Sequence, residues 1–455
     1  MSIIIIGAGE VGYNVAWKLS HERKDIVVID KDEERIERVS ETLDVQAIHG
    51  SGSSMKVLRN AGIEEAEIVI AATNSDEVNM VSCLVAGVQA SVPTKIARIR
   101  DPEYASNMQI LGSDRLDIDL VINTDQEMVA SILRILETPG ATDVVDFAEG
   151  KIRMASFLVG EQSPIIGKQL MDLSKLYPDI RVIIAAIYRD NQVIIPRGKD
   201  KILERDLVFL MGESPTISAL ISTAKSKHIS PLRRVMIFGG GDVGLNLAKA
   251  LEGMEISTKI IEPNEERCQF LAEELDKTMV LKGNFTSQDL LEEENVREMD
   301  AFVAVTPEEE KNILISLLAK RMGARRVVAS INRIAYSPLA YQIGVDVVIS
   351  PCLIAVNKIL QYIRRGKIVN VATLPDDQAE VIEIEALETS DLINKPLKNL
   401  RLPKGVLVGS ILRGGRLLIP YGETVILPGD KVAMVVATYA LQQLEKLVMV
   451  KLEYW

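Results

Sequence analysis

The same short glycine-rich motif occurs twice in this chain, once near its start and once past its middle. Residues 3–12 read IIIIGAGEVG, and residues 235–244 read VMIFGGGDVG. An acid ends the next apolar run in each copy, Asp30 in the first and Glu262 in the second. The same number of residues separates the last glycine of each motif from its acid. Two copies in one register predict two strand–turn–helix units that bind dinucleotides.

Each position of the motif has a physical reason. The apolar run predicts a parallel strand that is buried on both faces. The first glycine permits a tight turn, the second lets pyrophosphate approach the backbone, and the third lets the helix pack closely on the strand. The helix N-terminus then offers unpaired N–H groups to phosphates. A turn that only tightens packing stays the alternative for both copies. The predicted loop residues are Gly7, Ala8, Gly9, Glu10, Val11 and Gly12, and Gly239, Gly240, Gly241, Asp242, Val243 and Gly244.

The acids predict the class of nucleotide. We expect Asp30 and Glu262 to accept hydrogen bonds from ribose hydroxyls, each contributing roughly 1.5–3 kcal/mol because the acceptor is charged. An acid at this position disfavours a 2′-phosphate, so NAD or NADH, or another adenine nucleotide such as ATP or ADP, is preferred over NADP. Glu10 and Asp242 place a further negative charge in each loop. We interpret them as first-turn acids favoured by the helix dipole, the alternative being that they temper pyrophosphate affinity.

Composition narrows the class of protein. The chain has 455 residues, enough for several domains, with 47% hydrophobic but only 4% aromatic residues. This aliphatic character suits parallel strands covered by helices. The net charge is −12 without a long basic block, which argues against nucleic acid as a partner.

No targeting or membrane-spanning segment is expected. The N-terminus enters a strand directly, and the longest apolar stretches, such as 432–444, are shorter than the ~20 residues that span a bilayer. Cys83, Cys268 and Cys352 lie far apart without a C-x-x-C pair, so we expect reduced thiols and neither a disulfide nor a metal site. The sequence is typical of a cytosolic protein.

The internal repeat continues beyond the glycine motif. It places Thr73 opposite Thr306 and Asn79 opposite Asn312. Strand-like and helix-length segments alternate, which predicts a parallel sheet in each half. The matching segments are 49–54 with 282–287, 67–80 with 301–313, and 95–104 with 327–336.

After these segments, the predicted secondary structure of each half changes. Residues from about 143 to 222 and from about 370 to 439 contain short strands separated by turn signals, Asp190–Asn191 in one and Gly414–Gly415 in the other. This pattern predicts a small α+β module rich in hairpins. Two residue pairs recur at one offset, Pro196 with Pro420 and Asp206 with Asp430.

The predicted architecture is therefore α/β with two tandem repeats. Each repeat has a Rossmann-like parallel-sheet nucleotide subdomain followed by a small α+β C-terminal subdomain. The best linker between the halves is 223–234, which is basic and broken by Pro231. The predicted subdomains are 1–138, 139–226, 232–366 and 367–455.

This arrangement resembles the RCK family, the regulators of potassium conductance, over essentially the whole chain. The resemblance implies a cytosolic, nucleotide-sensing regulatory subunit, not an enzyme, on the inner face of the cell membrane. It also implies a potassium-transporting membrane protein as partner and a homotetramer whose two-copy chains form an eight-domain ring. The motifs that carry it are GAGEVG with Asp30, residues 71–80, residues 95–104, and GGGDVG with Glu262.

The resemblance extends the candidate site beyond the loops. It implies Ser51, Thr73, Asn74 and Arg98 in the first half and Thr306 in the second. Thr73 and Asn74 would close a strand beside the loop, where the family's nucleotide packs.

Two of these assignments have structural alternatives. Arg98 resembles the family's phosphate-facing arginine, whose fork suits bidentate oxygen contacts. Its alternative is a surface ion pair with Asp101 or Glu103. The alternative for Ser51 is a helix cap.

The second half departs from the first at three positions. Pro307 replaces Asn74, Ser330 replaces Arg98, and Pro263 follows the second acid and stiffens its loop. We therefore expect the second site to hold an anionic phosphate less well, or to hold a different nucleotide.

No catalytic set accompanies the fold. The chain has three histidines, His21, His49 and His228. His49 is near the loop but has no evident acidic partner in its motif, and His228 lies in the predicted linker. A dehydrogenase needs a general acid or base facing the nicotinamide. An NAD-dependent oxidoreductase with a duplicated Rossmann domain is the alternative function, and a nucleotide-binding scaffold unrelated to transport is a third.

Overall fold

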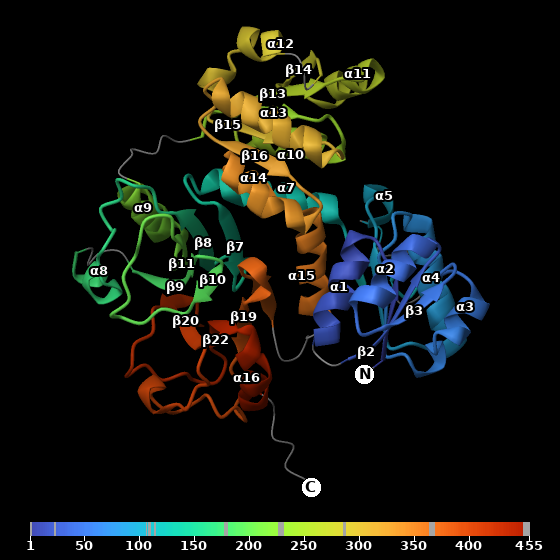
Figure 1. The fold of residues 1–455 in the computed structure, drawn as a ribbon, viewed down its shortest axis with the longest axis horizontal. Coiled ribbons are helices and arrows are strands. Elements are labelled where there is room, and N and C mark those ends of the chain that lie inside the picture. The colour runs from blue at the N-terminus through green and yellow to red at the C-terminus, as the bar shows by residue number, and fades with distance from the viewer. Residues whose placement is uncertain are drawn as a thin grey trace. The chain divides into compact units, whose positions relative to one another are not determined.

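The computed structural model describes residues 2–21, 24–105, 107, 111–112, 115–176, 181–225, 232–284, 288–363 and 369–448. The chain divides into two compact units, and each unit takes one part from each repeat (Figure 1). Unit 1 comprises residues 1–130 and 234–362, and unit 2 comprises residues 131–233 and 363–455.

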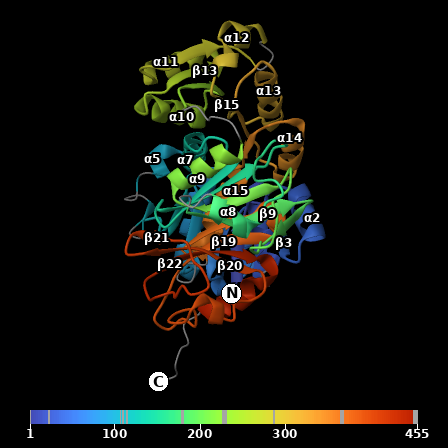
Figure 2. The same ribbon diagram turned by 90° about the vertical axis from the view of Figure 1, so that its left-hand side faces the viewer.

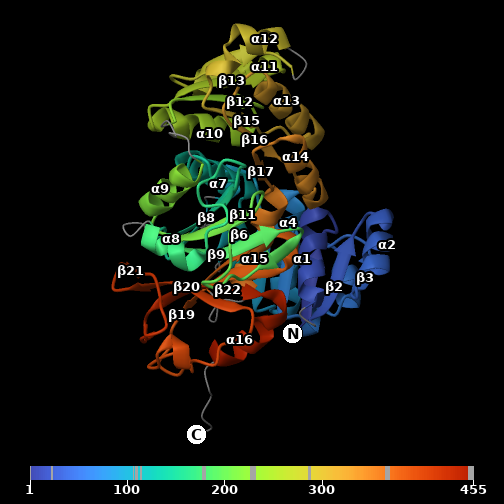
Figure 3. The same cartoon turned by 60° about the vertical axis from the view of Figure 1, so that its left-hand side comes forward.

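The first half of unit 1 is a six-stranded parallel sheet in the order β3-β2-β1-β4-β5-β6. In its centre, Ile4 lies opposite Val27 and Val69, and all three are buried because helices flank the sheet (Figure 3). The strands are β1 Ser2–Ile6, β2 Asp25–Asp30, β3 Gln46–His49, β4 Ile68–Ala71, β5 Thr94–Arg98 and β6 Leu120–Ile122, and the helices are α1 Glu10–His21, α2 Glu33–Thr42, α3 Met55–Asn60, α4 Asp76–Ala90, α5 Pro102–Ala105 and α7 Thr124–Glu137.

The second half of unit 1 repeats this topology, in the order β14-β13-β12-β15-β16-β17 (Figure 2). The chain reverses direction across the sheet between β12 and β15, as it does between β1 and β4. Sheets of this type bind ligands beside such a reversal, at the carboxyl ends of the strands. The strands are β12 Arg234–Phe238, β13 Ser257–Glu262, β14 Met279–Lys282, β15 Ala301–Ala304, β16 Val327–Ser330 and β17 Val347–Ile349, and the helices are α10 Asp242–Gly253, α11 Glu265–Glu274, α12 Gln288–Glu293, α13 Glu309–Arg321, α14 Ser337–Ile343 and α15 Pro351–Ile363.

Unit 2 contains two antiparallel five-stranded sheets, ordered β10-β9-β11-β8-β7 and β18-β19-β22-β20-β21. The predicted hairpin turns form at Asp190–Asn191 and Gly414–Gly415, where all four residues have positive φ. The strands are β7 Asp143–Phe147, β8 Ile152–Leu158, β9 Val182–Arg189, β10 Gln192–Ile194, β11 Leu207–Gly212, β18 Asn370–Thr373, β19 Ala379–Glu385, β20 Val406–Arg413, β21 Arg416–Leu418 and β22 Lys431–Ala437, and the helices are α8 Leu170–Leu176, α9 Ser214–Ala224 and α16 Leu441–Val448.

The two modules of unit 2 share one hydrophobic core. Phe147, Met154 and Phe209 of the first module pack in the same cluster as Val381 and Val435 of the second. All five are at most 3% exposed. Because one face of each sheet is apolar, each module covers a surface that the other would otherwise expose to water.

The acids that recur between the modules are structural. Asp206 is fully buried and accepts two hydrogen bonds of 2.7 Å from the guanidinium of Arg189. Asp430 accepts the corresponding pair from Arg413 at 2.9 and 2.7 Å. The shared offset therefore marks a bidentate ion pair that joins the end of β9 to the start of β11 in one module and the end of β20 to the start of β22 in the other.

The fold class predicted from the sequence is confirmed, with two parallel sheets and two small α+β modules. Residues 226–231 of the predicted linker, including His228 and Pro231, lie outside the described residues. The two ends of the predicted linker belong to regular elements, since α9 runs to Ala224 and β12 begins at Arg234. The four subdomain boundaries stay predictions. Within the described part of the chain, every helix is too short or too polar to cross a membrane.

Candidate functional site

The three glycines of the first loop differ in their backbone conformation and in what surrounds them. Gly7 has a φ of 105°, a conformation that favours glycine. A Cβ atom at Gly12 would lie 1.7 Å from the carbonyl oxygen of Gly7, so helix α1 can begin this close to β1 only without a side chain. At Gly9 a Cβ atom would meet only the guanidinium of Arg35, at 3.6 Å. The second glycine is thus free for a ligand to approach.

The second loop has the same construction. Gly239 has a φ of 110°, and a Cβ atom at Gly244 would lie 1.9 Å from the carbonyl oxygen of Gly239. A Cβ atom at Gly241 would meet nothing within 4 Å. Close packing explains the first and third glycines of both loops, but it leaves the second unexplained.

The two acids are fixed in position by backbone N–H groups. Asp30 accepts hydrogen bonds from the N–H of Ala8 at 2.6 Å and from that of Asp32 at 2.9 Å, one on each oxygen. Glu262 accepts the equivalent bonds from Gly240 at 2.7 Å and from Asn264 at 2.9 Å. A carboxylate has about four acceptor positions, so both acids keep capacity for ribose hydroxyls. The intervening Pro263 does not disturb this geometry.

A buried asparagine joins the ends of β4 and β5. The Oδ1 atom of Asn79 accepts from the N–H of Thr73 at 2.9 Å and from its hydroxyl at 2.7 Å. Its Nδ2 atom donates to the carbonyl oxygen of Thr73 at 3.2 Å and to that of Arg98 at 2.7 Å. Asn79 has no exposed surface. Sequence reasoning aligned this residue but assigned it no role.

The second half repeats the network. Asn312 bonds the N–H and hydroxyl of Thr306 at 3.0 and 2.7 Å, and its Nδ2 atom reaches the carbonyl oxygens of Thr306 and Ser330 at 2.8 and 2.9 Å. The hydroxyls of both threonines are therefore engaged within the protein. Both threonines hold the ends of their strands, and the contact of either with a nucleotide stays a prediction.

Arg98 lies at the end of β5 as an incompletely paired cation. Its Nε atom is buried and has no hydrogen-bond partner among the described residues. Burial lowers the pKa of the guanidinium, and neighbouring Arg100 acts in the same direction. Within the described part of the chain, Arg98 forms no ion pair with Asp101 or Glu103, and the N–H of Glu103 donates to Asp101 at 2.8 Å. An anion placed here would supply the missing partner.

Ser51 and Asn74 follow the ends of β3 and β4 respectively. Both are exposed. The Ser51 hydroxyl lies 2.9 Å from that of Ser53, and the N-cap residue of α3 is Ser54, so Ser51 is not the cap. The carbonyl oxygen of Asn74 accepts a hydrogen bond of 2.7 Å from Arg100. Their contact with a nucleotide stays a prediction.

The second half has a different cation at its loop. Ser330 is buried and carries no charge, and Pro307 is exposed. Arg267 instead donates from Nε to the carbonyl oxygen of Gly240 at 2.6 Å and from Nη2 to Asp242 at 2.9 Å. Sequence reasoning missed this residue, although an arginine follows both acids at the same distance.

The two halves of unit 1 also contact each other. The Nδ2 atom of Asn14 lies 3.6 Å from the sulfur of Cys352 at the start of α15, and Lys358 forms an ion pair with Glu127 at 2.9 Å. Burial raises the pKa of the Cys352 thiol to about 12. All three cysteines are free thiols.

The described histidines bind backbone groups. His21 contacts the carbonyl oxygen of Trp17 at 2.7 Å, and His49 contacts that of Lys31 at 3.0 Å. His228 lies outside the described residues. No cluster of three potential metal ligands occurs in the ranges that the structure describes.

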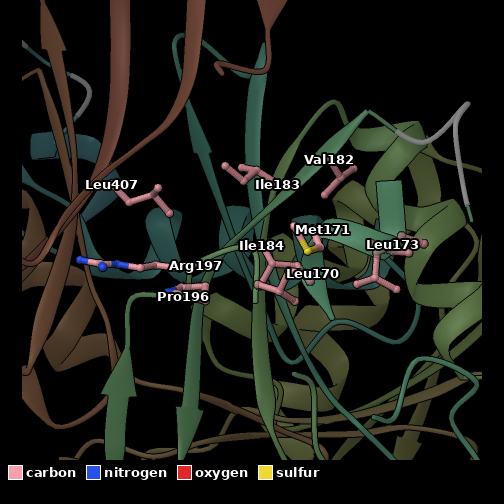
Figure 4. A pocket seen from close by; sticks show the side chains of 11 residues that line it. Leu170, Met171, Leu173, Val182, Ile183, Ile184, Pro196, Arg197 and Leu407 are labelled. Atoms are coloured by element: carbon pink, nitrogen blue, oxygen red, sulfur yellow. The ribbon is translucent and has the colours of Figure 1, made fainter. Parts of the chain in front are cut away.

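Unit 2 contains an apolar pocket that the sequence did not predict. It has a volume of about 420 Å³ and lies between α8, β9 and α9, with Leu407 of β20 on one side (Figure 4). Aliphatic side chains form most of the lining, and Arg197 is its charged member. Pockets of this size hold small ligands in many proteins.

Two parallel sheets with glycine loops and fixed acids, each followed in sequence by an antiparallel module, define a protein with two RCK-type repeats. The TrkA-N domain matches residues 3–124 and 235–351, and the TrkA-C domain matches residues 154–225 and 381–449. The chain is 38% identical over 462 aligned positions to the Trk system potassium uptake protein TrkA of Azorhizobium caulinodans, and 39% identical over 459 positions to that of Halomonas elongata. Both alignments cover all of both chains. The chain belongs to the TrkA family of potassium uptake proteins.

Solved structures support the same fold. The RCK domain of GsuK aligns with a TM-score of 0.61 at 18% identity, covering 98% of this chain and 94% of that one. The GsuK channel bound to NAD aligns with a TM-score of 0.60 at 18% identity, covering 98% and 78%. At this identity the likeness shows the fold alone. The family is one of transport proteins and not of enzymes, as the sequence predicted.

The contrast between Gly12 and Gly9 predicts opposite effects of one substitution. Gly12→Ala places a methyl group against the Gly7 carbonyl, and overpacking of this kind costs about 1–3 kcal/mol or more. Gly9→Ala meets only a flexible guanidinium and should leave stability unchanged or slightly raised. Thermal unfolding midpoints of the two variants measure the difference. Equal midpoints would contradict the close-packing role of Gly12.

The hydrogen bonds of Asn79 and Asn312 predict the effects of two matched substitutions. In Asn79→Asp the carboxylate cannot donate to the carbonyls of Thr73 and Arg98, and an unsatisfied buried group costs about 1–3 kcal/mol. We expect a lower unfolding midpoint and weaker binding of NADH at the first loop. Asn312→Asp is the control, with a similar loss of stability and unchanged binding at the first loop. Unaltered stability in both variants would show that the network is dispensable.

Proposed function

We propose that this chain is a nucleotide-sensing regulatory subunit that binds NAD or NADH and gates a Trk-type potassium-transporting membrane protein. The observation that carries the proposal is the first crevice. It combines an open second glycine, an acid held by two N–H groups, and the buried, unpartnered Nε of Arg98. The open glycine lets pyrophosphate approach, and the acid accepts hydrogen bonds from ribose hydroxyls. The arginine can pair with a phosphate.

The family supports the remaining parts of the proposal. Full-length relatives are named potassium uptake proteins of the Trk system, which favours a Trk-type transporter as the partner. One solved neighbour is a channel bound to NAD, and another, with a TM-score of 0.50, is bound to ADP. NAD or NADH is therefore our principal candidate, and ATP or ADP is the second. A cytoplasmic subunit at the inner face of the membrane is the location that fits this role.

Gating requires the nucleotide to bind one conformation better than another, because equal affinity shifts no equilibrium. Moving a gate from 1:99 to 99:1 takes about 5.5 kcal/mol of differential binding. One site would have to supply roughly a ten-thousand-fold difference in affinity. In a symmetric ring, several coupled sites would each supply a part of this differential binding free energy. This favours a homotetramer with two sites per chain.

We propose that the first loop is the principal site. It has Arg98 at the end of β5, whereas the second has the neutral Ser330. A hydrogen bond to a charged group contributes roughly 1.5–3 kcal/mol. The second site lacks the cation at this position, so it should bind a phosphate less tightly there.

Calorimetric titration with NADH tests this ranking. Asp30→Ala should weaken NADH binding more than Glu262→Ala, because it removes the acceptor of the principal site. Gly9→Val and Gly241→Val place a side chain in each approach at a position where a Cβ atom has room, and they should remove the stronger and the weaker binding event respectively. A larger loss from Glu262→Ala would reverse the ranking, and unchanged binding in all four variants would refute the site.

Light scattering and co-purification test the regulatory role. We expect the mass of four chains in solution, and retention of the protein on membranes that contain a Trk-type potassium transporter. A stable monomer at micromolar concentration would contradict the ring. Binding of NADH without any association with the transporter would favour a nucleotide-binding scaffold.

A further inference from the structure

The apolar pocket of unit 2 extends from the interior of the first module to its surface. Leu173 of α8 and Leu220 of α9 are 8% and 6% exposed, whereas Met171 of α8 is 45% exposed. Two further lining residues, Ile183 of β9 and Leu407 of β20, pack against the core that the two modules share. A ligand in this pocket therefore contacts both modules.

The second module can be compared with the first residue by residue, because the same backbone hydrogen bonds position its equivalent residues. Strands β9 and β20 have eight residues each, and each ends on the arginine that binds the recurring acid. Before each of these strands, two successive N–H groups donate to carbonyl oxygens of the segment that follows the hairpin. These pairs are Leu170 with Asp200 and Met171 with Gly198 in the first module, and Leu397 with Thr424 and Lys398 with Gly422 in the second.

The equivalent side chains of the second module belong to one hydrophobic cluster. Its members Leu397, Leu400, Val406, Val408 and Leu444 correspond to the pocket residues Leu170, Leu173, Val182, Ile184 and Leu220. The same apolar positions thus pack together in one module and line about 420 Å³ of space in the other. A difference in length accompanies this, since nine positions separate Leu173 from Val182 and six separate Leu400 from Val406. An apolar ligand would bury the surface that the first module leaves open.

The mouth of the pocket is positively charged. Residues 197–201 read RGKDK, and all five are exposed. Arg197 lines the pocket, and Figure 4 shows it on the same side as Leu407. Within the described part of the chain, the guanidinium of Arg197 has no hydrogen-bond or ion-pair partner, since the acid of this segment, Asp200, accepts from the backbone N–H of Arg197 at 2.6 Å. The equivalent of Arg197 in the second module is the neutral Tyr421. A carboxylate suits the free guanidinium fork.

We propose that this pocket binds a free aliphatic carboxylate of medium chain length. The alkyl chain lies among the aliphatic side chains of α8, β9 and α9, and the carboxylate pairs with Arg197 at the mouth. The apolar lining selects the chain, and the arginine selects the charge of the head group. The site belongs to unit 2 and is separate from the glycine loops of unit 1, so the proposal does not depend on nucleotide binding.

Calorimetric titration of the full-length chain with hexanoate, octanoate and decanoate, each below its micellar concentration, tests the apolar part of the site. The affinity should rise by about fourfold for each added methylene group until the pocket is full. Octylammonium has the same chain as an octyl carboxylate but the opposite charge, and it should bind at least about tenfold more weakly than octanoate.

Three variants test the residues. Arg197→Gln should weaken octanoate binding by about threefold or more. Arg205→Gln is the matched control, because it removes the same charge from an exposed residue of the same module outside the pocket lining, and it should leave the affinity nearly unchanged. Ile184→Trp fills the pocket with an apolar ring and should abolish octanoate binding. Thermal unfolding of each variant verifies that it is folded.

Several results would overturn the proposal. These are no binding of any of the three carboxylates, an affinity that does not depend on chain length, equal binding of octylammonium, or an unchanged affinity in Arg197→Gln. Arg197-dependent binding to vesicles of anionic phospholipid, without binding of the free carboxylates, would assign the pocket to a membrane lipid instead. A lower mass of the Ile184→Trp assembly in light scattering, again without carboxylate binding, would assign it to a second copy of the chain.

Discussion

The hydrogen bond between each glycine loop and the acid of the neighbouring strand is the constraint on which the site depends. The N–H of Ala8 reaches Asp30 at 2.6 Å, and that of Gly240 reaches Glu262 at 2.7 Å. This bond joins the ends of two adjacent parallel strands. It fixes both the acid and the turn from which the next helix starts, so the acid keeps a constant position relative to the open glycine. The carboxylate is stable there because each of its oxygens accepts a hydrogen bond from a backbone N–H group.

The two repeats have the same backbone geometry around their glycine loops but carry different charged side chains. Asn79 and Asn312 make the same four hydrogen bonds, so the strand ends beside the two loops are held alike. The side chains around these loops differ, because a neutral serine replaces Arg98 and a neutral asparagine replaces Asp32.

Much of the site was predictable from residue type and spacing. The glycines, the two acids and the alignment of the threonines follow from the geometry of a strand–turn–helix unit, which leaves few choices of residue. Asn79 and Arg267 were not assigned, because their roles depend on contacts between residues distant in the fold. The sequence alone does not show whether an asparagine is buried or exposed. The direction of a long arginine side chain depends on which carboxylates lie within reach, and this is known only once the helices are placed.

The sequence by itself determined the duplication, the parallel strands of the large parts, the hairpins of the small modules and the position of each glycine loop. These properties are local, since they follow from apolar periodicity and from turn residues. Only the tertiary structure decided which parts associate: the two parallel-sheet halves form one compact unit, and the two small modules form the other with a common core. The physical reason is that an apolar sheet face must be covered, but its own sequence does not specify which partner covers it. The choice depends on shape and burial across residues hundreds of positions apart.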